Sequence, residues 1–175
     1  MLHHPARALH VALVEPEIHW NTGNAGRTCL ATGATLHLIQ PFGFSLDDRE
    51  VRRAGLDYWP QVSVETWSSF REFEGAISNL GEAFFFTPDA ERTLWDVAYP
   101  PRVVLVFGSE TRGLSREIRD RHRDRLVSLP MENRNVRALN LSTAVGVALY
   151  EVLRQWRSAG SGQLVSGLAP TGDRG

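Results

Sequence analysis

The chain has 175 residues, of which 42% are hydrophobic and 22% are charged, so it reads as one soluble globular domain. It lacks the roughly 20-residue apolar run of a membrane span and any secretory signal pattern near its start, so we expect a cytoplasmic protein that contacts no membrane. The lone Cys29 excludes an intrachain disulfide and is expected to be a small buried residue, and the six histidines lack metal-ligand spacing, which predicts no metal.

Strands and helices are expected to alternate along the chain. The apolar run at 9–14 predicts a buried strand, and the helix expected from Asn21 to about Thr32 begins where Asn21 or Thr22 can cap free N–H groups. Acids at 47 and 48 predict a helix that ends near 55. Further strands are expected at 35–39, 62–65, 83–87, 103–107 and 126–129, and further helices at 68–79, 115–122 and 140–157. This order predicts an α/β fold with a mostly parallel sheet.

The composition changes near residue 158. From there on the chain is rich in Gly, Ser, Pro and Thr, which is typical of a flexible tail. The sequence therefore predicts a domain over 1–157 and a tail over 158–175.

The charge gives a mixed indication of the partner. The formal net charge is −1, which does not favour nucleic acid, but all 19 basic residues are arginine, a side chain suited to bidentate phosphate contact. Arginines cluster at 49, 52 and 53 and again between 112 and 137. Phosphate contact and ordinary solvated helix faces both fit these clusters.

The expected last helix is apolar on more than one side. One continuous stripe runs along it, and Val147 and Tyr150 lie outside that stripe. The second apolar side fits either a partner subunit or a deep core. The stripe consists of Leu141, Ala144, Val145, Ala148, Leu149, Val152, Leu153 and Trp156.

Three segments that follow strands or open helices carry candidate binding chemistry: 21–27 (NTGNAGR), 107–114 (FGSETRGL) and 129–142. Because ligands gather at the carboxyl ends of strands in open α/β sheets, all three can meet at one edge. None is a phosphate loop, a GxGxxG dinucleotide fingerprint or a GxSxG nucleophile turn. Each segment taken alone is better explained as a turn with a helix cap.

Together these segments resemble the three motifs of the SPOUT RNA methyltransferases, and most closely the tRNA (cytidine/uridine-34)-2′-O-methyltransferases. The matching stretches lie in order over about 9–157: EPEIHWNTGNAGRTCLATG, IQPFGF, RRAGLDYW, VFGSETRGL, LPM and ALNLSTAVGVALYE. The resemblance implies a C-terminal deep trefoil knot and a homodimer with the active site at the subunit interface. It also implies S-adenosylmethionine (AdoMet) as cofactor and the anticodon stem-loop of tRNA as substrate, methylated on the ribose 2′-hydroxyl of nucleotide 34.

The resemblance also implies site residues. The cofactor is expected to contact Phe86, Thr87, Gly108, Gly113, Leu129, Met131, Ala138 and Leu139. The catalytic set is expected to be Arg27, Asn21, Glu110, Asn140 and Ser142. Pro88 and Asp89 depart from the small polar residues expected beside Phe86.

Individual roles in this set follow from side-chain chemistry. A guanidinium stays protonated, so we expect Arg27 to grip an RNA phosphate and stabilise the developing alkoxide rather than act as a base. Glu110 is expected to orient Arg27 or loop backbone. Asn140 and Ser142 suit either the reaction or a helix cap, and Asn21 either the substrate or a cap. For Arg112, phosphate contact and a surface salt bridge both remain open.

Three other functions compete with this interpretation. The chain could methylate another tRNA or rRNA ribose, or bind RNA without catalysis, or be a generic nucleotide-binding domain. The joint presence of the catalytic set argues against a non-catalytic protein.

Overall fold

The computed structural model describes residues 6–44, 57–133 and 135–161, with side chains to residue 159. Six strands form one sheet in the order β3-β2-β1-β5-β4-β6, and every pair of neighbours is parallel. The strands are β1 (Ala8–Val14), β2 (Thr35–Ile39), β3 (Val64–Trp67), β4 (Glu82–Phe86), β5 (Arg102–Phe107) and β6 (Leu126–Val127). The predicted α/β class with a parallel sheet is confirmed, whereas the trefoil knot stays a prediction.

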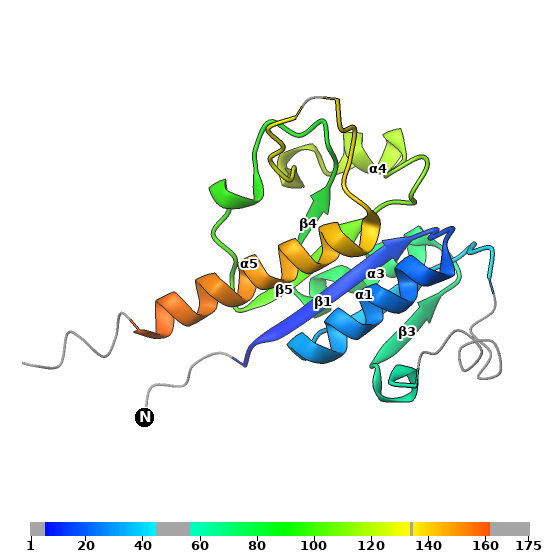
Figure 1. Cartoon of the computed structure of the whole chain (residues 1–175), viewed down its shortest axis with the longest axis horizontal. Helices are drawn as coiled ribbons and strands as arrows, with labels where there is room; N and C mark the ends of the chain where they lie inside the picture. Colours follow the sequence, from blue (N-terminus) through cyan, green and yellow to red (C-terminus); the bar gives the residue numbers. More distant parts are fainter. Residues whose placement is uncertain (1–5, 45–56, 134, 162–175) are drawn as a thin grey trace, which may run out of the picture.

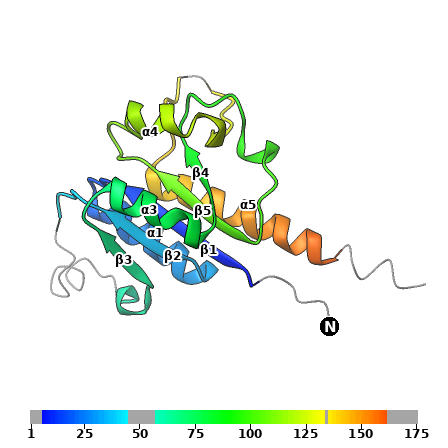
Figure 2. The ribbon, with the colours of Figure 1, turned by 180° about the vertical axis from the view of Figure 1, so that it is seen from behind.

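Helices cover both faces of this sheet (Figures 1 and 2). The helices are α1 (His19–Thr32), α3 (Phe70–Leu80), α4 (Arg116–Arg121) and α5 (Leu141–Ser161), with short 3-10 turns η1 (Trp59–Gln61), η2 (Leu94–Asp96) and η3 (Arg123–Arg125). One apolar cluster joins α1 and α5 to one face, and a second joins α3 and α4 to the other. Because successive strand residues point to opposite faces, β1 and β5 supply both clusters.

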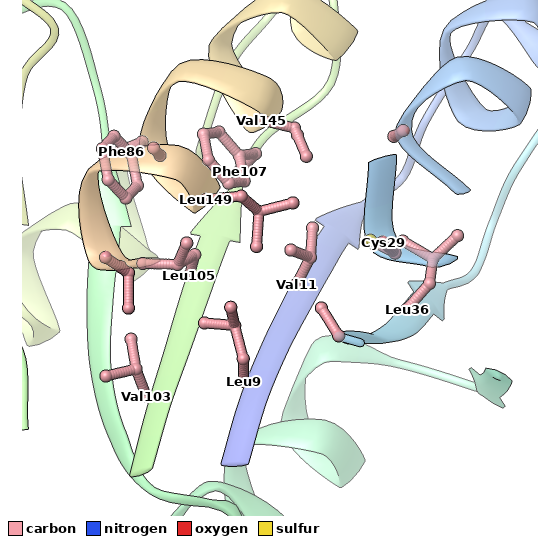
Figure 3. Packing of buried hydrophobic residues seen from close by; sticks show 14 of the residues in the cluster. Leu9, Val11, Cys29, Leu36, Phe86, Val103, Leu105, Phe107, Val145 and Leu149 are labelled. Atoms are coloured by element: carbon pink, nitrogen blue, oxygen red, sulfur yellow. The ribbon is translucent and has the colours of Figure 1, made fainter. Parts of the chain in front are cut away.

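The first cluster fixes the position of α5. Its side chains Val145 and Leu149 are fully buried and pack over Leu105 and Phe107 of β5 (Figure 3). Burial of one such side chain contributes about 1.5–3 kcal/mol to folding, so this contact holds α5 firmly on the sheet. Cys29 of α1 is buried in the same cluster, as expected, and burial raises the pKa of its thiol to about 12.

Several predicted bounds are wrong by a few residues. β3 begins and ends two residues late, and β6 ends two residues early, at Val127. α5 continues to Ser161, four residues into the predicted tail. The helix predicted from 47 to 55 and the arginines at 49, 52 and 53 lie outside the described residues.

The predicted cap of α1 is also wrong. The helix begins at His19 with Ile18 as its N-cap, and no side chain of the cap residue accepts a hydrogen bond. Asn21 and Thr22 are instead buried inside the first turn. The free N–H groups at this end find an acceptor from a distant loop, described below.

Candidate functional site

A cavity of about 470 Å³ lies at the carboxyl ends of β4, β5 and β6, a volume within the range of small-molecule sites. The first turns of α1 and α5 form the wall nearest β1. Between β1 and β5 the order of strands in the sheet reverses direction, which is where ligands bind in open α/β sheets. Its walls come mostly from the three predicted segments and the end of β4, and Ile18, Arg119 and Ala144 complete them. The other lining residues are Asn21, Phe86–Asp89, Phe107–Leu114, Leu129, Met131 and Arg137–Leu141.

All eight residues expected to contact the cofactor line this cavity: Phe86, Thr87, Gly108, Gly113, Leu129, Met131, Ala138 and Leu139. Phe86 stacks on Phe107 at the cavity wall, with ring centroids 4.6 Å apart. Pro88 and Asp89, which differ from the small polar residues expected beside Phe86, also line the cavity. The cavity wall is therefore present at these positions, with different side chains.

The loop after β5 is folded so tightly that it needs glycine. A Cβ atom on Gly108 would lie 2.0 Å from the backbone carbon of Gly113 and 2.1 Å from the nitrogen of Leu114. Gly113 has a φ of 64°, in the left-handed region that glycine adopts without strain. Its N–H donates to the carbonyl of Ser109 at 2.9 Å, which closes the loop on itself.

Glu110 joins this loop to the start of α1. Its carboxylate accepts the backbone N–H of Glu17 at 2.7 Å and that of Ile18 at 3.2 Å, so it supplies the acceptor that the helix end lacks. It also accepts the side-chain amide of Asn21 at 3.0 Å. Glu110 was expected to orient either Arg27 or loop backbone. Its hydrogen bonds to the backbone of Glu17 and Ile18 match the second role, and among the described residues its carboxylate has no hydrogen bond to Arg27.

Asn21 and Asn140 extend this network to α5. The amide of Asn140 donates to Asn21 Oδ1 at 2.8 Å. Its own Oδ1 accepts the backbone N–H of Ser142 at 2.9 Å and the Ser142 hydroxyl at 2.7 Å. Asn140 thus caps α5 and ties that cap to α1, so Asn21, Asn140 and Ser142 of the expected catalytic set share one hydrogen-bond chain.

Sequence reasoning missed Glu17 and Thr111. The Glu17 carboxylate accepts the Thr111 hydroxyl at 2.7 Å and the Thr111 backbone N–H at 3.1 Å. The segment before α1 and the loop after β5 therefore bind each other reciprocally: Glu17 accepts hydrogen bonds from the loop, and Glu110 accepts hydrogen bonds from the segment before α1. Glu17 lies in the EPE stretch of the first motif, but nothing local indicates a partner 94 residues away.

Arg27 and Ser142 are the two expected catalytic residues that do not line the cavity, as its described walls define it. Arg27 is exposed on α1, and its guanidinium lies 4.5 Å from the ring centroid of Tyr58. The Tyr58 hydroxyl donates to the carbonyl of Gly23 at 2.8 Å, and burial raises the pKa of Tyr58, which keeps it a neutral donor.

Most arginines between 112 and 137 are ion-paired. Arg112 pairs with Glu15 at 3.2 Å, which matches the surface salt bridge considered for it. The other paired members are Arg116, Arg119, Arg121 and Arg125. Arg123 and Arg137 have no ion pair or side-chain hydrogen bond among the described residues, so they are the cations in this stretch with most capacity for an outside anion.

The described residues contain neither a membrane-spanning helix nor a metal-binding cluster. No helix there is long and apolar enough to cross a membrane. No group of three or more His, Cys, Asp or Glu side chains in the same part of the chain is placed to hold a metal ion.

Comparison with known proteins places this geometry in a family. The sequence profile of the SpoU rRNA Methylase family matches residues 8–150. A tRNA (cytidine(34)-2′-O)-methyltransferase of Burkholderia pseudomallei is 46% identical over 155 residues, covering 86% of this chain and 96% of the relative.

Solved structures agree with that match. One, described as giving structural insights into the 2-OH methylation of C/U34 on tRNA, has a TM-score of 0.80 at 41% identity and covers 87% of this chain and 98% of that one. AviRb of Streptomyces viridochromogenes, solved in complex with AdoMet, shares the fold with a TM-score of 0.75 at 24% identity, covering 89% of this chain and 60% of its own. The chain therefore belongs to the SpoU methylase family and is a methyltransferase.

Proposed function

We propose that the chain transfers a methyl group from AdoMet to the ribose 2′-hydroxyl of nucleotide 34, cytidine or uridine, in tRNA. The observation that carries the proposal is that the three motif segments meet in one cavity at the carboxyl ends of β4–β6. The activity of the similar Burkholderia enzyme and the subject of the 41% identical structure support this choice of nucleotide.

The cavity residues fit AdoMet. Phe86, Phe107 and Leu129 offer an apolar wall for an adenine ring, and the backbone around Gly108 and Gly113 can approach a ligand closely. Carboxylates at Glu110 and Asp89 line the same space and suit a cationic ligand. The AdoMet complex of AviRb, which has the same fold, adds support. AdoMet supplies the electrophilic methyl group, and no metal is required for that chemistry.

We propose that the active unit is a homodimer formed across α1 and α5. The two helices lie side by side on one face of the sheet (Figure 1). Their outer side exposes large apolar residues, with Trp20 50%, Val147 44% and Tyr150 58% exposed. Val147 and Tyr150 thus lie outside the buried stripe, as predicted. A partner subunit of the same chain would cover a surface that is costly to leave in water.

The same dimer accounts for the position of Arg27. Asn21 of α1 and Ala144 of α5 line the cavity, so the first turns of both helices border it. Arg27 lies on the outer side of α1. Packing two copies there would bring Arg27 of one subunit toward the cavity of the other, where its planar guanidinium can bind an RNA phosphate and stabilise the alkoxide. A phosphate oxygen or a water molecule would take the proton of the 2′-hydroxyl.

The remaining expectations follow from this activity. With a net charge of −1, tRNA binding should be modest and strongly salt-dependent, and a bare domain of this size should depend on the anticodon stem-loop more than on the tRNA body. A tRNA-modifying enzyme without a membrane-spanning helix in its described part suits the cytoplasm.

The decisive experiment is methyl transfer from labelled AdoMet to tRNA that lacks the modification, followed by mass spectrometry of the product nucleosides. A 2′-O-methylated pyrimidine at position 34 is the expected product. A methyl group on another ribose would keep the reaction and move the target. Cofactor binding without transfer to any tRNA would overturn the proposal in favour of rRNA or a non-catalytic RNA-binding role.

A further inference from the structure

A second cavity of about 470 Å³ lies beside the first, along α4 and η3. It shares Thr87, Asp89 and Arg119 with the wall of the first cavity, so the two spaces are neighbours. Three of the seven residues around it are arginines: its lining is Thr87, Asp89, Arg116, Arg119, Asp120, Arg123 and Leu126.

The charges in this second cavity leave donors available. Arg116 lies 3.4 Å from Asp120 in a largely exposed pair, and Arg119, itself partly buried, lies 3.2 Å from the exposed carboxylate of Asp89. Such exposed pairs are weak and yield to a better acceptor. Arg123 has no ion pair or side-chain hydrogen bond within the described part of the chain. The lining therefore carries a net positive charge, with three cationic side chains against two carboxylates.

Arg119 adds a second indication of a missing acceptor. Its Nε atom is buried and has no hydrogen-bond partner in the described structure. Buried polar groups are almost always satisfied, so an Arg119 side chain that turns toward an oxygen acceptor in the adjoining cavity gains a hydrogen bond that its Nε lacks. A phosphate offers several such oxygens to a group of guanidiniums.

We propose that this second cavity binds a backbone phosphate of the RNA substrate, next to the cavity for the cofactor. The proposal rests on the proposed function, because it takes the substrate to be tRNA. Arg123 provides the main contact, Arg116 and Arg119 turn toward the phosphate from their exposed carboxylate partners, and the shared wall keeps the bound strand beside the reacting centre.

The test is the salt dependence of tRNA affinity in the full-length chain, measured by filter binding from 50 to 200 mM KCl. Arg123→Gln is expected to weaken binding and to reduce the slope of log affinity against log salt by about one unit, as for the loss of one phosphate contact. Arg123→Lys keeps the charge and should retain most of the slope. The matched control is Arg121→Gln on the same segment, because Glu74 at 2.6 Å and Glu117 at 2.7 Å already hold that guanidinium outside the cavity.

Two results would overturn the second cavity as a phosphate site. One is a wild-type slope in Arg123→Gln. The other is an equal loss in Arg121→Gln, which would mean that the arginines act as a diffuse field. If the wild-type chain binds S-adenosylhomocysteine but no tRNA at any salt concentration, the choice of tRNA in the proposed function fails as well, so the two failures are distinguishable.

Discussion

Glu17 and Glu110 hold each other's loops: the Glu110 carboxylate accepts the backbone N–H of Glu17 at 2.7 Å, and the Glu17 carboxylate accepts the hydroxyl of Thr111 at 2.7 Å. This reciprocal clamp fixes the loop after β5 against the start of α1, and both segments line the cavity proposed for the cofactor.

Glu17→Gln is therefore expected to weaken binding of S-adenosylhomocysteine by roughly tenfold, because the loss of a hydrogen bond to a charged acceptor costs about 1.5 kcal/mol. Isothermal titration calorimetry measures this change. The control is Glu15→Gln, which removes only an exposed pair with Arg112. Equal affinities in wild type and Glu17→Gln would contradict a positioning role for the clamp.

Gly108→Ala is expected to abolish cofactor binding and to destabilise the fold by about 1–3 kcal/mol, since the new methyl group would overlap the backbone of Gly113 and Leu114. Denaturant unfolding and ligand titration test both effects. Gly75→Ala on α3 is the matched control, because a methyl group added there would meet no atom within 4 Å. That change should stabilise the chain by about 0.5–1 kcal/mol.

Arg27→Lys is expected to lower turnover by on the order of 100-fold while leaving cofactor affinity unchanged, because lysine keeps the charge and loses the planar fork. Single-turnover methyl transfer measures the effect. Near-normal turnover in Arg27→Lys would eliminate the fork as the source of alkoxide stabilisation.

Tyr150→Asp should dissociate the proposed homodimer, since it places a charge in the exposed apolar side of α5. Sedimentation velocity is expected to show a monomer, with methyl transfer lost at the same time. A wild-type chain that sediments as a monomer would refute the dimer directly, and an active monomeric variant would refute the two-subunit site.

Stability should fall as the pH drops from about 6.5 to about 4. His37 is fully buried, accepts the indole N–H of Trp67 at 3.1 Å and contacts His10 at 3.0 Å. Burial lowers the pKa of His37 to about 4. Between pH 6.5 and pH 4 this histidine is therefore protonated in the unfolded chain and neutral in the folded chain. Each pH unit then costs about 1.4 kcal/mol.

Urea unfolding at pH 7 and pH 5 measures this loss. His37→Phe is less stable at pH 7 because Trp67 and His10 lose their partner, but the slope between the two pH values should flatten. An unchanged slope in His37→Phe would assign the pH dependence to other groups.

Much of the sheet was predictable from local patterns. β2 was predicted with the bounds Thr35–Ile39 because a buried parallel strand is a short apolar run between turn signals. The edge strand β3 is only partly buried, so its apolar pattern is weaker, and its predicted bounds lie two residues before the observed ones. α5 passes the predicted end because an established helix propagates cheaply, and Ser158 donates back to the carbonyl of Arg154 at 3.1 Å.

The position of the candidate site in the fold was predictable from the sequence, whereas the hydrogen bonds among its residues were not. The carboxyl ends of the strands indicated where the motif segments meet, and the eight expected wall residues do meet there. The misassigned cap at Asn21 has a physical cause: its side-chain oxygen accepts the amide of Asn140, 119 residues away, instead of a local N–H group. A pairing over such a distance leaves no local signal, and the same is true of Glu17 with Thr111.

The walls of the cavity are drawn from segments between Ile18 and Ala144, and the last of them belong to the final helix. In a chain emerging from the ribosome this cavity is therefore incomplete until α5 has joined the sheet. A ligand in this cavity therefore binds only the completely folded chain. Its binding free energy stabilises the whole domain rather than one part of it.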